Sequence, residues 1–196
     1  MPLGLDPLYL FLIVGMASPG PNVILLATFG ARFGFRATLS HMLGVVIGVS
    51  IIGAAAGLGI ASILISFPEL QLAARIGAAI WIVWMAWGLY RSEIHGSADD
   101  RARPFSLGEA VLFQWVNPKI WAVALAAMAG FSKGLTPVEE AVRLATAFGS
   151  VNLAVCILWT ATGSYLRRFL TTPADWRVFM GTMAFCLAAS AGMVFL

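Results

Sequence analysis

The sequence predicts an all-α, polytopic membrane protein with six transmembrane helices arranged as two inverted three-helix repeats. Hydrophobic residues make up 60% of the 196-residue chain and charged residues only 11%, and the mean hydropathy is +0.90. A single soluble core of this length cannot bury so much apolar surface, so the lipid bilayer has to act as the solvent. The Lys and Arg residues are scattered and form no continuous basic face, which argues against a nucleic-acid partner.

Six apolar stretches are each long enough to cross the bilayer, which takes roughly 20 residues. They cover residues 7–29, 39–67, 70–90, 109–131, 138–166 and 176–196. No basic residue precedes the first stretch and no small-residue cleavage site follows it. We therefore expect this stretch to be retained as a helix rather than removed as a signal peptide.

The basic residues between these stretches predict the orientation of the chain. The first, third and fifth connections hold eight Lys or Arg residues, whereas the opposite side holds three. The odd connections are therefore expected in the cytoplasm, with both termini in the periplasm. The third connection, at about 92–105, divides one transporter domain into a first repeat at about 5–91 and a second at about 106–196. Three helices in each repeat give the two repeats opposite orientations.

The first apolar stretch is interrupted by prolines. Pro19 and Pro21 flank Gly20 and are followed by Asn22, well inside the apolar run. Each proline removes a backbone donor and clashes with the preceding turn, so a continuous α-helix is not expected here. The freed backbone groups need a partner from protein, water or a ligand. Amides at the start of the second helical half carry the positive end of the helix dipole and suit a carboxylate.

The fourth stretch has a matching interruption at Asn117-Pro118-Lys119, and it opens the second repeat as the first stretch opens the first. Proline-interrupted helices at corresponding positions of inverted halves are typical of a transporter binding site. We therefore predict substrate binding by Pro19, Gly20, Pro21, Asn22, Asn117, Pro118 and Lys119, with the two asparagine amides on either side of one cavity. The alternative is that the prolines only kink the bundle.

Lys119 is the only charged residue deep inside any predicted span. An unpaired ammonium near the bilayer midplane is costly, so it is expected to face a partner, water or substrate. The functional interpretation makes it a carboxylate ligand or a proton-linked switch. The structural alternatives are capping by carbonyls freed at Pro118 and snorkelling to the cytoplasmic interface.

The remaining polar residues give weaker signals. Gln114 and Asn152 lie within spans, where such groups either join functional networks or hydrogen-bond across helices. Cys156 and Cys186 each lie inside an apolar stretch and indicate neither a disulfide nor a metal site. The sequence has no nucleotide-binding loop, zinc-protease motif or hydrolase nucleophile motif, so neither an enzyme nor a cofactor is expected.

Two other classes stay open on these residues alone. An intramembrane enzyme or thiol redox carrier would have Ser18, His41, Cys156 and Cys186 as its reagents, although these share no recognised catalytic spacing. A non-transporting membrane scaffold would explain the helices but not a lysine near the midplane.

Several further motifs accompany the two interruptions. They are Ser18-Pro19-Gly20-Pro21-Asn22, then Gly30, Gly34, Arg36, Gly44 and Gly48, then Gly77-Ala78-Ala79, and Asn117-Pro118-Lys119. Together they resemble the LysE/RhtB family of amino-acid exporters over essentially the whole chain. The segments at 77–87 and 114–119 are most similar to the cysteine/O-acetylserine exporter branch. The sequence departs from the family at Ile80, where tyrosine is common, and at 129–131, where Pro-Gln-Phe often ends the fourth helix.

The resemblance implies a bacterial inner-membrane exporter of amino acids or close derivatives, driven by the proton motive force rather than by ATP. Its partners would be the amino-acid substrate, protons as coupling ion and membrane lipid, with a homodimer left open. The mechanism we predict is alternating access around the broken first and fourth helices. A distantly similar branch carries electrons through cysteines on those two helices; this sequence has none there, which argues against that role.

Overall fold

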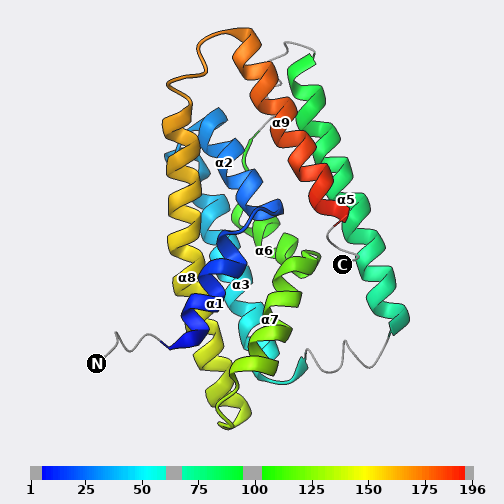
Figure 1. Cartoon of the computed structure of the whole chain (residues 1–196), viewed down its shortest axis with the longest axis vertical. Helices are drawn as coiled ribbons and strands as arrows, with labels where there is room; N and C mark the ends of the chain where they lie inside the picture. Colours follow the sequence, from blue (N-terminus) through cyan, green and yellow to red (C-terminus); the bar gives the residue numbers. More distant parts are fainter. Residues whose placement is uncertain (1–5, 61–67, 95–102, 193–196) are drawn as a thin grey trace.

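The computed structural model describes residues 6–60, 68–94 and 103–192, and all regular secondary structure in these ranges is helical (Figure 1). The helices are α1 (Pro7–Ala17), α2 (Pro21–Phe33), the short 3-10 helix η1 (Arg36–Thr38), α3 (Leu39–Gly57), α5 (Pro68–Ile94), α6 (Leu107–Trp115), α7 (Pro118–Phe131), α8 (Pro137–Leu166) and α9 (Pro173–Gly192). The predicted all-α class is confirmed for this part of the chain. Much of the predicted connection at 92–105, and the predicted ends at Phe67 and Leu196, lie outside the described residues.

Fewer spans than the predicted six stand out by length and apolarity. Within the described residues, Arg36–Gly57 and Pro137–Leu166 qualify on their own, with mean hydropathies of 1.9 and 1.7. The total rises to four if α1 with α2, and α6 with α7, each form one bent span. This count does not test the predicted third and sixth spans, in α5 and α9, over their full length, so they stay predictions. The chain is thus a multi-pass membrane protein with two to four spans supported in this way.

Local sequence marks where most of these helices begin. Ser106 and Glu109 form a reciprocal capping box at the start of α6, and Thr136 and Glu139 form another at the start of α8. Asp6 caps α1 by accepting a hydrogen bond from the Leu8 amide. Proline, which fits the first helical turn because no donor is needed there, opens α1, α2, α7 and α8.

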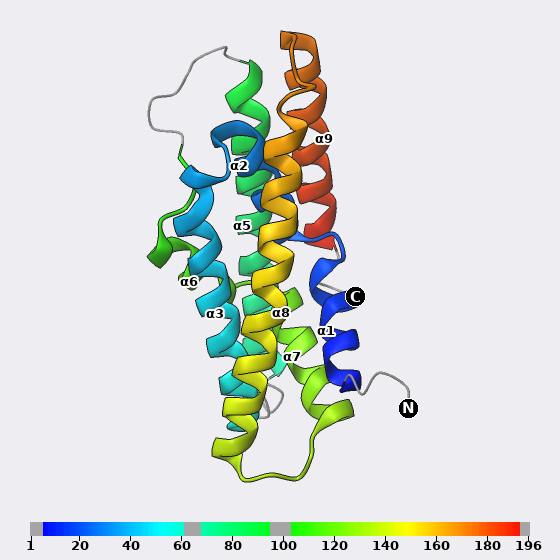
Figure 2. The same cartoon turned by 90° about the vertical axis from the view of Figure 1, so that its left-hand side faces the viewer.

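The long helices α3 and α8 form the centre of the bundle (Figure 2). Helices α2 and α1 pack against α8, and α6 and α7 pack against α3. Glycines allow the closest approaches: a Cβ atom on Gly163 of α8 would collide with the Ala27 carbonyl of α2, and one on Gly44 of α3 with the Leu107 carbonyl of α6. These backbones can meet only because the side chain is absent.

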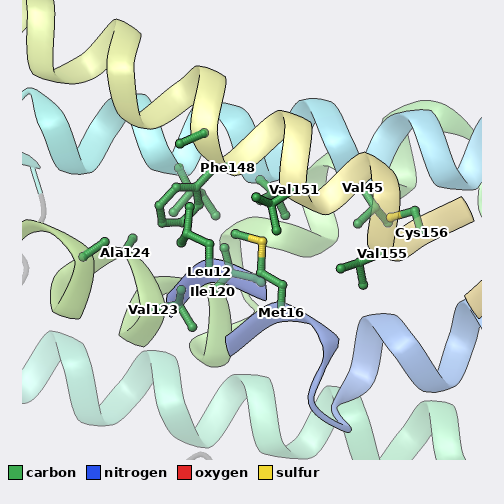
Figure 3. Packing of buried hydrophobic residues seen from close by; sticks show 14 of the residues in the cluster. Leu12, Met16, Val45, Ile120, Val123, Ala124, Phe148, Val151, Val155 and Cys156 are labelled. Atoms are coloured by element: carbon green, nitrogen blue, oxygen red, sulfur yellow. The ribbon is translucent and has the colours of Figure 1, made fainter. Parts of the chain in front are cut away.

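Helices α5 and α9 form a pair that stands beside α2, at the right of Figure 1. Two apolar clusters result. One joins α1, α3, α7 and α8 around residues such as Leu12, Val45 and Phe148 (Figure 3), and the other joins α5 and α9 around Ile82 and Leu187. Helix α2 contributes to both clusters and is buried from residue 21 to residue 31. It therefore separates the central bundle from the α5 and α9 pair.

Candidate functional site

Both predicted helix interruptions are present. The chain leaves α1 at Ala17 and resumes in α2 at Pro21, with a bend of 61° between the two helices. It leaves α6 at Trp115 and resumes in α7 at Pro118, with a bend of 60°. At both places the new helix begins with a proline, which cannot continue a preceding helical turn because it has no backbone N–H and its ring clashes with that turn. The expectation of broken first and fourth apolar stretches is confirmed.

Lys119 connects the two interruptions. Its Nζ donates to the Ser18 carbonyl oxygen and, at 3.4 Å, to that of Pro19. These carbonyls follow the C-terminal end of α1, where the helix dipole favours a positive charge. A Cβ atom on Gly20 would lie 2.9 Å from Lys119 Cδ. The absence of a side chain at Gly20 therefore leaves room for the Lys119 side chain to pass over it. The carbonyls that cap Lys119 thus come from the opposite interruption and not, as one sequence alternative proposed, from Pro118.

Asn22 and Gln114 form a second connection between the same two regions. Asn22 Nδ2 donates to Gln114 Oε1 at 2.7 Å, and Gln114 Nε2 returns a hydrogen bond to Asn22 Oδ1 at 3.2 Å. Gln114 Nε2 also donates to the Ala110 carbonyl at 3.0 Å. The reciprocal pair ties α2 to α6 and leaves Asn22 with less capacity for a ligand than its sequence motif suggested.

Asn117 is the least satisfied polar group of the site. Its side chain is 1% exposed, and neither Nδ2 nor Oδ1 has a hydrogen-bond partner among the described residues. It occupies the N-cap position of α7 but its side chain caps no amide. A buried amide left unpaired costs free energy, and such groups in folded proteins usually meet water or a ligand. Asn117 is therefore available to a bound solute.

Helix α8 adds two polar groups that the sequence did not single out as site residues. Cys156 Sγ donates to Asn152 Oδ1 at 2.9 Å, and Asn152 Nδ2 lies 3.7 Å from Met16 Sδ. Both residues are buried. Their spacing of four residues puts them on one face of the helix, and the sequence signal for a site was weak: a polar amide within a predicted span, one turn before a cysteine.

Two cavities meet at Lys119. The first is lined by Met16, Gly20, Asn22, Val23, Leu26, Asn117, Lys119, Ile120, Asn152, Val155 and Cys156. The second is lined by Gly20, Pro21, Ile82, Asn117, Pro118, Lys119 and Ser190. The volume open to the centre of a water-sized sphere is about 10 Å³ in the first cavity and about 70 Å³ in the second, so the first has room for little more than a water molecule. A solute therefore enters the first cavity only if its walls move.

The structure brings most of the predicted site residues together. Six of the seven line one cavity or both, and Asn22 and Asn117 share the first cavity as expected. Pro19 lines neither, but its carbonyl accepts from Lys119. Among the residues that line the cavities, Lys119 is the only charged one, and the rest of the polar lining consists of amides, a thiol and a hydroxyl. This lining suits a solute that carries an anionic group.

The groups proposed for an intramembrane enzyme or redox carrier do not assemble. Ser18 Oγ donates to the Gly15 carbonyl at 2.9 Å within its own helix. His41 and Cys186 line neither cavity, whereas Cys156 lines the first. Both cysteines are free. Within the described ranges no group of three or more His, Cys, Asp or Glu residues is placed to hold a metal ion.

An ion pair joins α1 to the turn between α7 and α8, away from the cavities. Lys133 Nζ lies 2.7 Å from Asp6 Oδ2. The hydrogen bond from Lys133, together with that from the Leu8 amide, lowers the pKa of the Asp6 carboxyl below its ordinary value. This end of the bundle, for which the sequence predicts a periplasmic location, thus has an ion pair between the two halves of the chain.

Comparison with known proteins gives a consistent result. The family described as LysE type translocator matches residues 13–196. A cysteine/O-acetylserine efflux protein of Salmonella choleraesuis (strain SC-B67) is 30% identical over 133 residues. Proteins of the same name from Shigella flexneri and Escherichia coli O139:H28 are 29% identical over the same length. Each alignment spans 66% of this chain and 66% of the relative, and no solved structure matches.

Proposed function

The chain belongs to the family of LysE type translocators, and on this premise we propose that it is a secondary transporter that exports amino acids or close derivatives across the bacterial inner membrane. The observation that carries the proposal is the junction of the two broken helices, where Lys119 reaches the carbonyls after α1 beside the unpaired Asn117. Translocators are transporters rather than enzymes, in agreement with the absence of catalytic motifs from the sequence. The names of the relatives support an amino-acid substrate.

Two inverted repeats, at about 5–91 and 106–196 around a connection at about 92–105, are part of the proposal. Helix pairing supports them: α3 packs against α8, the second apolar stretch of one repeat against that of the other, and α5 packs against α9, the third against the third. The two bent spans, at 61° and 60°, are also alike. The distribution of basic residues supports termini in the periplasm.

The proposed binding mode uses donors and acceptors at the junction. The first helical hydrogen bond of α2 runs from the Ile24 amide to the Gly20 carbonyl, so the Asn22 and Val23 amides have no helical acceptor. These amides and Asn117 suit a substrate carboxylate. When the carboxylate attracts Lys119 away from the Ser18 and Pro19 carbonyls, those carbonyls become acceptors for the substrate ammonium.

The proposed transport cycle is alternating access around this junction, driven by the proton motive force. The narrow first cavity supports a cycle in which helices separate on one side and then on the other, because a bound solute needs more room than the present walls leave. The C-terminal end of α1 and the N-terminal end of α7 are the parts of the junction that would have to separate. A protonophore would then stop uphill export without preventing downhill exchange.

Efflux from proteoliposomes loaded with L-cysteine or O-acetyl-L-serine tests the function. The wild type should release both solutes, and Lys119→Ala and Asn117→Ala should each release them at least about tenfold more slowly, because each removes a donor from a desolvated site. Lys133→Ala is the matched control, since Lys133 lies outside both cavities and its ion pair is half exposed. Undiminished efflux in both site variants would remove these residues from the mechanism.

A further inference from the structure

The second cavity lies between the two helix interruptions and the pair formed by α5 and α9. Pro21 of α2 and Pro118 of α7 form one wall, and Ile82 of α5 and Ser190 of α9 form the other. Ile82 is 1% exposed and Ser190 is 6% exposed. The cavity therefore places residues of the α5 and α9 pair against the interruptions in the first and fourth apolar stretches, although neither residue belongs to a proline motif.

The surface that these residues turn toward the second cavity is apolar. Ser190 Oγ donates to the Leu187 carbonyl at 2.7 Å, so the hydroxyl proton is used within α9. The proline rings and the Ile82 side chain offer no hydrogen-bonding group. The part of the cavity away from Asn117 and Lys119 favours an apolar group and disfavours a charge, because nothing there replaces the hydration that a charge would lose.

The two cavities share three lining residues, one of which is Lys119. Gly20, Asn117 and Lys119 line both of them. The lysine side chain crosses over Gly20 to reach the Ser18 and Pro19 carbonyls. Movement of Lys119 away from these carbonyls would therefore join the polar first cavity to the apolar second one. Asn117, which has no partner among the described residues, lies at the place where they would join.

We propose that the two cavities are the two parts of one substrate site: the carboxylate and ammonium of the transported amino acid occupy the first cavity, and its side chain occupies the second. Ile82 and Ser190 then set the size of side chain that the protein accepts. This inference rests on the function proposed above and narrows the substrate class to amino acids with small, uncharged side chains. Lysine and arginine are excluded because the second cavity has no acidic partner for them, and aspartate and glutamate because Lys119, its only charge, is engaged by the α-carboxylate of the substrate.

Two variants that change the size of the second cavity in opposite directions test the inference. Efflux is measured from proteoliposomes loaded with L-cysteine, O-acetyl-L-serine and L-leucine. Ile82→Ala widens the cavity and should raise the efflux of the two larger solutes relative to cysteine by at least about tenfold, the lower end of the effect of one methylene group in an apolar pocket. Ser190→Val fills the cavity and should lower the same ratio. Ile80→Ala is the matched control, because Ile80 lies on the same helix but is 65% exposed on its outer face.

The ratio compares solutes transported by the same protein, so differences in the amount of folded protein cancel. If Ile82→Ala is poorly retained in the membrane, Ile82→Val carries the test with a smaller shift in the same direction. Equal ratios in Ile82→Ala, Ser190→Val and Ile80→Ala would overturn the inference while leaving the proposed function intact, provided that the wild type exports the solutes. A wild type that exports none of the three would overturn the proposed function and this inference with it.

Discussion

The two helix interruptions have the same shape and different chemistry. Both new helices begin with proline, and the bends of 61° and 60° are nearly equal. At the N-cap, however, the first has Gly20 and the second has Asn117. The first interruption therefore supplies room and backbone carbonyls, whereas the second supplies a side-chain amide and, one residue after its proline, an ammonium. The two interruptions thus have the same backbone shape, but their side chains offer different chemical groups to the junction.

The residues that follow the two prolines show the same division. Asn22 follows Pro21 and Lys119 follows Pro118. Each side chain reaches the other interruption: Asn22 bonds to Gln114, near the end of α6, and Lys119 bonds to Ser18, just after α1. The first contact is a closed amide pair, whereas the second joins a charge to carbonyls that a substrate ammonium can also use. Under the proposed mechanism, equivalent positions of the two interruptions therefore have different roles, one structural and one in transport.

The largest effect is expected when the second interruption is given the N-cap residue of the first. Asn117→Gly removes the unpaired amide, so efflux of O-acetyl-L-serine should fall by about 10- to 100-fold, equivalent to the 1–3 kcal/mol of a lost hydrogen bond in a buried site. The thermal midpoint Tm in detergent should stay the same or rise, because a buried unsatisfied group has been removed. Unchanged efflux would show that the two N-cap positions do not differ in function.

The next effect concerns stability at the position after Pro21. Asn22→Ala leaves the Gln114 amide buried without its partner and should lower the free energy of unfolding by about 1–3 kcal/mol. Replacing both partners, in Asn22→Leu with Gln114→Leu, should recover much of that loss because no polar group is then left unpaired. Tm measurements on the single and double variants check this. A double variant no more stable than the single one would contradict the structural role of the pair.

A smaller effect is expected from giving the first interruption a side chain. The Cβ atom in Gly20→Ala would lie 2.9 Å from Lys119 Cδ and 3.1 Å from Nζ, and because a flexible lysine can move by a few tenths of an ångström, efflux should fall by only about two- to fivefold. Gly88→Ala on α5 is the control, since a Cβ atom there meets nothing within 4 Å. Equal efflux in the two variants would argue against a need for open space at Gly20.

The smallest effect concerns the ion pair between Asp6 and Lys133. Because the folded state lowers the Asp6 pKa, mainly through the hydrogen bond from Lys133, this carboxylate stabilises the protein at pH values above its unfolded pKa. The contribution is lost as the pH falls through the lower folded pKa. The difference in Tm between wild type and Asp6→Asn should therefore be small at pH 7, as expected for a partly exposed pair worth less than about 1 kcal/mol, and should vanish in strong acid. A difference that grows as the pH falls would contradict this assignment.

Sequence alone identified the features that depend on local chemistry or on composition. The high apolar content required a membrane, and Pro19, Pro21 and Pro118 required interrupted helices, because proline acts on its own turn whatever surrounds it. The importance of Lys119 followed from the cost of a charge in an apolar stretch. Two to four spans are supported in the described residues, and the predicted number of six stays a prediction.

Only the tertiary structure decided which groups meet. Lys119 and Ser18 are 101 residues apart, and Asn22 and Gln114 are 92 apart, so no local pattern relates them. Asn152 and Cys156 line the first cavity, and Ile82 and Ser190 line the second, because α8, α5 and α9 pack beside the interruptions. Helix packing sets such distances, and a buried amide has the same appearance in a sequence whether its partner is a neighbouring helix or a substrate.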